Sequence, residues 1–120
     1  MKPFLHGRMH AKKYGGSPED YADIDDFIDS PKSAFPDFRH RAILHNSFGC
    51  FLVERVFGRT RENSSGITYS PRDVAEDHII QDLGFIPTVE RYLDNMTPQP
   101  WMSGTKRGSE KTTRFIPLSD

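Results

Sequence analysis

Apolar residues along this chain recur with helical spacing, in stretches that mostly begin near a proline and end at a glycine. Pro3 opens the first stretch and Gly15–Gly16 closes it. Ser17–Pro18 and Ser70–Pro71 combine a capping serine with a proline in the first turn, which is a frequent helix start. The pattern therefore predicts helices over residues 3–14, 18–28, 36–57, 71–83 and 88–95.

The stretch 36–57 is the longest, and we expect it to form the backbone of the fold. Pro36 stands where it would start or kink this helix, and Gly58 follows it as a stop signal. Cys50 lies in an apolar segment and is expected to be a buried small hydrophobe. The predicted core stripe of this helix comprises Phe38, Leu44, Phe48, Phe51, Leu52 and Val56.

Two further segments complete the predicted architecture. Residues 59–70 contain a Ser-Ser-Gly turn followed by Ile67, Thr68 and Tyr69, which predicts a short β-hairpin. The fold class is therefore mainly α, a compact bundle of four to five helices around a long central helix, with a hairpin insertion. We expect residues 1–102 to form one domain and residues 103–120 to be a flexible basic tail, disordered or folding onto a partner through its Phe-Ile-Pro-Leu segment.

Charge and composition exclude several classes of function. The net charge of -1 gives no global support for binding nucleic acid, which depends on a basic surface. A single cysteine rules out an intramolecular disulfide and a cysteine-rich zinc site. No apolar run is long enough for a membrane span or a signal peptide, so we expect a cytoplasmic protein with no membrane partner.

His78 and Asp82 carry the clearest chemical signal, because they lie four residues apart on the best-delimited helix. This spacing puts both side chains on one face, about 6 Å apart, where one metal ion can bridge them. Val74, Ala75 and Ile79 lie on or beside the same face, so the pair is expected to point inward. A simple His-Asp or Arg-Asp bond that stabilises helix packing is the alternative explanation.

The other histidines are less clearly placed. His6 lies among apolar residues and is expected to point inward, whereas His10, beside two lysines, is expected at the surface. His40 and His45 would lie about 140° apart on one continuous helix, so we do not expect them to share an ion. The six acids of the second helix are expected to form a solvated face: Glu19, Asp20, Asp23, Asp25, Asp26 and Asp29.

These considerations predict a site for a divalent metal such as zinc, manganese or iron. Its expected ligands are His6, His40, His78 and Asp82, with Asp37 close to His40. Arg39 and Arg41 flank His40 and are candidates for binding a phosphate or another anionic ligand, although pairing of an arginine with Asp37 is the common alternative. The chain contains no HExxH, Walker, GxSxG or cysteine-based zinc motif, so we do not expect covalent catalysis.

The segments FPDFRHRAILHNSFGCFLVERVFG, VAEDHIIQDLGFIPTVERYL and PQPWM resemble an uncharacterised family of small proteins from bacteria and tailed phages. The family pattern matches His6 with Gly15–Gly16, a DFRHRA segment followed by His45 and Glu54, the His78–Asp82 pair, and a closing Pro-Trp-Met. The resemblance covers residues 4–102. The resemblance implies a shared fold and a phage or prophage origin, with the host cytoplasm as the location. It does not indicate any particular activity.

Three functions remain open at this point. The first is a small metal-dependent protein, such as a hydrolase of phosphate esters or nucleotides. The second is a modulator that binds a host protein through its acidic second helix or basic tail. The third is a small-ligand or nucleotide binder that uses Arg39, Arg41 and the aromatic residues. A helical domain of this size can also form a homodimer.

Overall fold

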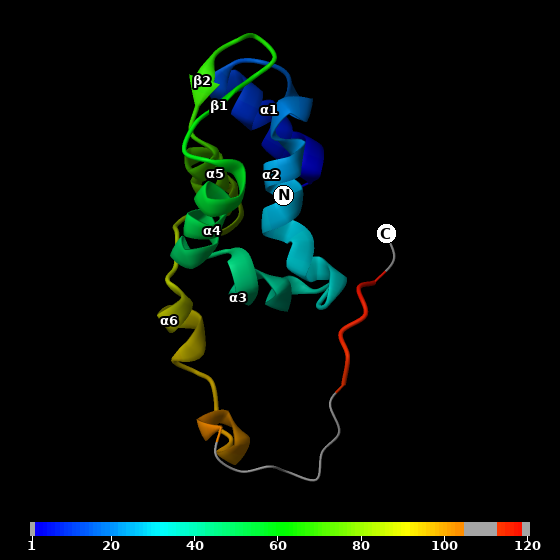
Figure 1. Ribbon diagram of the computed structural model, residues 1–120, viewed down its shortest axis with the longest axis vertical. Helices are drawn as coiled ribbons and strands as arrows, with labels where there is room; N and C mark the ends of the chain where they lie inside the picture. Colours follow the sequence, from blue (N-terminus) through cyan, green and yellow to red (C-terminus); the bar gives the residue numbers. More distant parts are fainter. Residues whose placement is uncertain (1, 105–112, 119–120) are drawn as a thin grey trace.

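Helices supply almost all the regular structure of the computed structural model, which describes residues 2–104 and 113–118 (Figure 1). The mainly α fold class with one short hairpin is therefore confirmed. Helix α1, Pro3–Tyr14, has the predicted bounds. The second predicted helix is a 3₁₀ turn at Pro18–Tyr21 that continues into α2, Ala22–Asp29, with a further 3₁₀ turn at Ser30–Ser33.

Helix α5, Pro71–Leu83, also has the predicted bounds, and its ends explain why. The Ser70 hydroxyl accepts a hydrogen bond from the Asp73 amide, which satisfies one of the free donors of the first turn. Gly84 ends the helix with a φ of 85°, a left-handed conformation that favours glycine. The helix packs against α4 and also contacts α1 and α2.

The hairpin between α4 and α5 is confirmed. Strand β1, Arg61–Glu62, pairs antiparallel with β2, Thr68–Tyr69, and Arg61 lies opposite Tyr69. Asn63 closes the loop, because its side-chain oxygen accepts hydrogen bonds from the amides of Ser65 and Ile67. Its side-chain NH₂ also donates to the carbonyl of Tyr14, which attaches the hairpin to the end of α1.

The predicted long central helix over residues 36–57 is wrong, because the chain turns a corner at Asn46. A 3₁₀ turn at Phe38–His40 and a short helix α3, Arg41–Leu44, precede the corner, and helix α4, Ser47–Phe57, follows it. Asn46 is extended, and its side-chain oxygen accepts a hydrogen bond from the Gly49 amide at 2.8 Å, which starts a new helix. The Asn46 NH₂ group donates to the carbonyls of Ala42 and Ile43 and so ties the two helices together.

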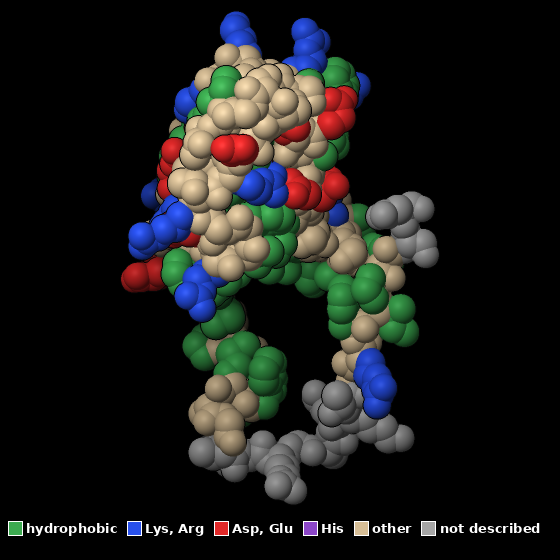
Figure 2. Space-filling model, turned by 45° about the horizontal axis from the view of Figure 1, so that its top comes forward, with side chains coloured by type: hydrophobic (Ala, Val, Ile, Leu, Met, Phe, Trp, Pro, Cys, Tyr) green, Lys and Arg blue, Asp and Glu red, His purple; other side chains and the backbone are tan. Residues whose placement is uncertain are grey.

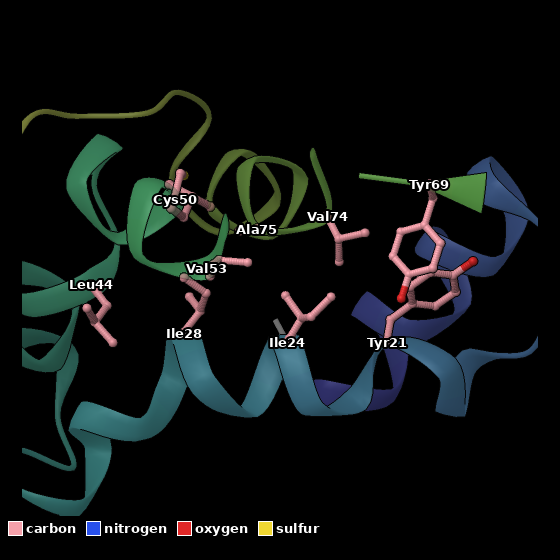
Figure 3. Packing of buried hydrophobic residues seen from close by; sticks show 10 residues of the cluster. Tyr21, Ile24, Ile28, Leu44, Cys50, Val53, Tyr69, Val74 and Ala75 are labelled. Atoms are coloured by element: carbon pink, nitrogen blue, oxygen red, sulfur yellow. The ribbon is translucent and has the colours of Figure 1, made fainter. Parts of the chain in front are cut away.

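The corner also changes which residues form the core. Leu44 is buried as predicted, but Phe38, Phe48, Phe51 and Val56 are between 42% and 75% exposed, so the predicted stripe is largely wrong. Helix α4 instead buries Cys50, as predicted, and Val53. Figure 3 shows Ile24 and Ile28 of α2 pointing toward Val53 and Val74, with Tyr21 and Tyr69 at one end of this core.

The C-terminal part of the domain extends away from this core. Helix α6, Val89–Leu93, buries no residue, and Leu93 is 50% exposed. Every residue from Leu93 to Gly104 is exposed, including a 3₁₀ turn at Pro100–Ser103; we call residues 93–104 the arm. Figure 2 shows hydrophobic side chains gathered along the arm and the neighbouring underside of the body.

The predicted flexible tail lies only partly within the described residues, since residues 105–112 and 119–120 fall outside them. Residues 113–118 form no helix or strand, and the Leu118 amide donates a hydrogen bond to the Ser33 carbonyl at 2.9 Å. No helix in the described part of the chain is both long and apolar enough to cross a membrane.

Candidate metal centre

All five histidines of the chain are buried, with exposed fractions between 0% and 5%. His6 and His10 come from α1, His40 and His45 from the two ends of α3, and His78 from the middle of α5. Three aspartates lie among them: Asp25 and Asp29 from α2 and Asp82 from α5. The expected surface position of His10 is therefore wrong, and we call these eight residues the His/Asp cluster.

Two carboxylates form the centre of the cluster. The Asp29 Oδ1 atom lies 3.2 Å from the Nε2 of His78, 3.5 Å from that of His45 and 3.8 Å from that of His40. The Asp82 Oδ2 atom lies 2.9 Å from His45 Nε2 and 3.3 Å from His78 Nε2. Asp82 Oδ1 lies 3.3 Å from His6 Nε2. Four imidazole Nε2 atoms thus converge on two carboxylates.

Four of these residues meet the geometric requirement for holding one ion. Asp29, His45, His78 and Asp82 each offer a donor atom, and these atoms all lie within 4.8 Å of one another. The structure therefore brings the predicted His78 and Asp82 together with two residues that the sequence argument had set aside. His6 and His40, also predicted as ligands, lie beside this four-residue set at the distances given above.

The opposite nitrogen of three imidazoles is held by an acceptor. His78 Nδ1 donates to Asp25 Oδ1 at 2.8 Å, His6 Nδ1 to the Gln81 side-chain oxygen at 2.5 Å, and His40 Nδ1 to the Asp37 carbonyl at 2.8 Å. Such bonds at Nδ1 fix the ring orientation and leave Nε2 to face the carboxylates. The Nδ1 of His45 is buried and has no hydrogen-bond partner among the described residues.

The surroundings in the cluster shift the pKa values of several of its histidines and aspartates. Burial alone lowers the pKa of His78, but hydrogen bonds to Asp25, Asp29 and Asp82 outweigh burial and raise that pKa to about 10. Burial opposes ionisation of Asp29, yet its hydrogen bond and charge interaction with His78 lower its pKa to about 2. Hydrogen bonds from histidines lower the pKa of Asp25 and Asp82 against the effect of burial. Burial lowers the pKa of His45.

These shifts keep the three carboxylates ionised at neutral pH. Protonated His78 bonds to Asp25 and Asp29, and Lys32 Nζ lies 3.5 Å from Asp29. Ionised carboxylates in a protein interior need cationic partners, and a bound metal ion is one such partner. The cluster therefore has both the donor atoms and the acidic groups that suit a divalent ion.

The cluster opens to the surface on the side of Asp29. The Asp29 side chain is 16% exposed, whereas that of Asp82 is 4% exposed and those of His45 and His78 are fully buried. A cleft of about 610 Å³ adjoins Asp29, and Lys32 Nζ lies 3.5 Å from the Asp29 carboxylate. The cleft is lined by Pro3, Asp26, Asp29, Ser30, Lys32, Ser33, Pro117 and Leu118.

Arg39 and Arg41 are not among the residues that line this cleft. The Arg39 guanidinium is exposed and binds both carboxylate oxygens of Asp37, through Nε at 3.0 Å and Nη2 at 2.9 Å. The Asp37 backbone carbonyl therefore accepts a hydrogen bond from His40, whereas the Asp37 carboxylate is bound by Arg39. Lys32, in contrast, lies beside the cluster at Asp29.

Asp25, Asp29 and His45 were not predicted to belong to the cluster, for two reasons. Asp25 and Asp29 were counted in a solvated acidic face, although they flank Ile28 on a helix whose inner face carries Ile24 and Ile28. His45 was excluded on the assumption of a continuous helix. The Asn46–Ser47 pair, which is typical of a helix N-terminus, was the available signal that the helix ends there.

Comparison with known proteins identifies the family. The family model described as a domain of unknown function (DUF6915) matches residues 1–102. The chain belongs to this family. Its membership of an uncharacterised family was expected from the sequence, and the matched range includes the whole His/Asp cluster and almost all of the arm. No curated protein and no solved structure matches the chain.

Proposed function

We propose that this protein binds a divalent transition-metal ion, such as zinc, manganese or iron, through Asp29, His45, His78 and Asp82. The observation that carries the proposal is the convergence of four donor atoms from α2, α5 and the α3–α4 corner within 4.8 Å. Imidazole and carboxylate are common ligands of all three metals.

The spacing of the donors supports this reading. Two donors that bind one tetrahedral ion at about 2.0–2.2 Å lie about 3.3–3.6 Å apart. The two imidazoles lie 3.2 Å and 3.5 Å from Asp29, and 3.3 Å and 2.9 Å from Asp82. An ion at the centre of the set requires only small displacements of these side chains.

The surroundings of His78 also resemble those of a metal ligand. Its Nε2 faces Asp29 and Asp82, and its Nδ1 donates to Asp25. A carboxylate behind a histidine ligand is a common arrangement at zinc sites, where it fixes the ring and strengthens its donor nitrogen. When the metal binds, it replaces the proton that His78 Nε2 carries in the metal-free protein.

A metal-free network of His-Asp hydrogen bonds is the competing explanation. Such a network satisfies His78 well, but it leaves the Nε2 of His6 without a hydrogen-bond partner among the described residues, although that ring is fully buried. A divalent ion removes this deficiency.

The chemistry that we propose for the bound ion is hydrolysis of a phosphate ester. A metal with histidine and carboxylate ligands lowers the pKa of bound water to about 7 and so supplies hydroxide as a nucleophile. The cleft at Asp29 gives access for a substrate, and Lys32 lies where it can bind a phosphate oxygen. This part of the proposal is tested by release of phosphate from a generic aryl phosphate, monitored with and without added metal.

Metal content of the untagged protein tests the binding itself. We expect elemental analysis to find zinc, manganese or iron in the purified protein, and to find it lost in His78→Ala and Asp82→Ala. Asp73→Asn is the matched control, because it changes an exposed carboxylate on the same helix. Protein that binds no metal after dialysis against each of the three ions contradicts the proposal.

The arm favours a second candidate function, which is association with another protein chain. Trp101 is 62% exposed, Met96 49% and Met102 41%, and residues 95–104 carry no charged side chain. An uncharged apolar segment that is exposed over its whole length is typical of a protein interface. A second copy of the chain is the partner we expect, and light scattering after size-exclusion chromatography should show a dimer that Trp101→Ala weakens.

A further inference from the structure

Two buried imidazoles flank the four-donor set from opposite sides. The ring centroids form a series in which His6 lies 3.9 Å from His78, His78 lies 5.1 Å from His45, and His45 lies 5.3 Å from His40. His6 therefore stands beyond His78, and His40 beyond His45. Neither is needed for a single four-coordinate ion.

His6 has the orientation of a metal ligand. Its Nδ1 donates to Gln81, so the nitrogen that faces Asp82 is Nε2. This atom is fully buried, makes no hydrogen bond with any described residue, and lies 3.3 Å from Asp82 Oδ1. A buried nitrogen without a hydrogen-bond partner is costly, and a cation between it and the carboxylate would remove that cost.

His40 has the equivalent arrangement on the other side. Its Nδ1 donates to the backbone carbonyl of Asp37 at 2.8 Å, and its Nε2 lies 3.8 Å from Asp29 Oδ1. A backbone carbonyl at Nδ1 is a frequent orienting contact of histidine ligands. Each carboxylate at the centre of the cluster thus faces one imidazole outside the four-donor set.

From this arrangement we infer that the cluster holds two divalent ions rather than one. The inference rests on the proposed metal binding. One ion is bound by His6, His78 and Asp82, and the other by His40, His45 and Asp29. Asp82 bridges them, because its Oδ1 faces His6 while its Oδ2 lies 2.9 Å from His45.

A two-ion centre also suits the chemistry proposed for the cluster. Paired metals about 3.5–4 Å apart bind the attacking and leaving oxygens of a phosphoryl group. A phosphate ester that enters at Asp29 beside Lys32 is therefore the substrate class that a two-ion centre fits.

Metal stoichiometry tests the inference. Untagged protein is stripped with a chelator, dialysed against Mn²⁺ and analysed for metal per chain, together with His6→Gln and Lys12→Gln. Lys12→Gln is the matched control, since Lys12 is an exposed residue on the same helix, outside the His/Asp cluster. We expect two ions in the wild type and in Lys12→Gln, and one in His6→Gln.

The outcomes separate the two proposals. One ion in the wild type overturns the two-ion centre and leaves the metal site standing, whereas no ion overturns both. Two ions in His6→Gln contradict the role of His6. If the variant does not fold, electron paramagnetic resonance of the Mn²⁺-loaded wild type decides: a spin-coupled pair supports the inference, and the spectrum of isolated Mn²⁺ overturns it.

Discussion

Single residues decide which nitrogen of each imidazole faces the centre of the His/Asp cluster. Asp25 is the most connected of them, because its Oδ1 accepts from His78 Nδ1 at 2.8 Å and from His10 Nε2 at 2.9 Å. It lies behind His78 and is 4% exposed. Asp25 is therefore a positioning residue, which would act on the proposed metal through His78.

Replacing Asp25 with asparagine should weaken metal binding without abolishing it. The amide keeps the volume but loses the charge that holds the His78 ring, and loss of such a contact typically lowers metal affinity by about 10–100-fold. Isothermal titration of the metal-free protein measures the dissociation constant. Asp73→Asn, which changes an exposed carboxylate outside the cluster, should leave it within about twofold; an equal loss in both variants contradicts the role of Asp25.

His78 and Asp29 together should stabilise the metal-free protein most between about pH 4 and pH 6.5. The pKa of His78 rises from 6.5 to about 10 on folding, so its contribution is complete below pH 6.5 and is lost as the pH rises through 10. The pKa of Asp29 falls from 3.8 to about 2, so its contribution is complete above pH 3.8 and is lost as the pH falls through 2. Urea unfolding at a series of pH values measures the free energy. A free energy of unfolding that does not change from pH 6 to pH 10 in the metal-free protein contradicts the protonated His78.

Among the structural elements, the α3–α4 corner does most to assemble the cluster, because it turns His45 inward. Asn46 begins α4, and Gly49 lets α4 approach the end of α3 closely. A Cβ atom on Gly49 would lie 1.9 Å from the Leu44 carbonyl oxygen. The position of His45, a ligand in the proposed metal site, therefore depends on the close contact that Gly49 allows with Leu44.

Gly49→Ala should destabilise the protein and weaken metal binding together. Overpacking of this kind typically costs about 1–3 kcal/mol, and here the obstacle is backbone that cannot rotate away. Urea unfolding of the metal-free protein and a metal titration measure the two effects. Ser47→Ala, an exposed residue in the first turn of the same helix, is the control. A Gly49→Ala variant with unchanged stability would show that the corner is not tightly packed.

The sequence predicted best those elements whose ends carry local signals. The bounds of α1 and α5 were predicted from Pro3, Ser70–Pro71 and Gly84. Because the bounds of α5 were right, the inward orientation of His78 and Asp82 was also predicted. The corner at Asn46 was missed because apolar residues continue through it at nearly helical spacing. Asp25 and Asp29 were missed because burial of a carboxylate depends on partners from other helices, which no local pattern encodes.

For the molecule as a whole, the cluster acts as a cross-link between distant parts of the chain. His6, Asp29, His45 and Asp82 come from α1, α2, the α3–α4 corner and α5, and the apolar core consists of few large side chains. Much of the stability of this fold is therefore expected to come from the cluster. A ligand that binds only the folded state adds to that stability in proportion to the logarithm of its concentration.

Removing the metal should lower the melting temperature substantially. Free metal at 100 times its dissociation constant stabilises the folded state by about 2.7 kcal/mol, which corresponds to roughly 10 °C for a domain of this size. Differential scanning calorimetry with chelator and with added ion measures the difference. His78→Ala should show no shift on adding metal, and a shift equal to that of the wild type would place the binding elsewhere.

The most direct test of the account is a crystal structure of metal-loaded protein, with anomalous scattering recorded at the absorption edge of the ion. We predict density in the His/Asp cluster about 2.0–2.2 Å from the Nε2 atoms of His45 and His78 and from carboxylate oxygens of Asp29 and Asp82. An anomalous map with no peak among these residues, in crystals soaked with Zn²⁺ or Mn²⁺, would contradict it.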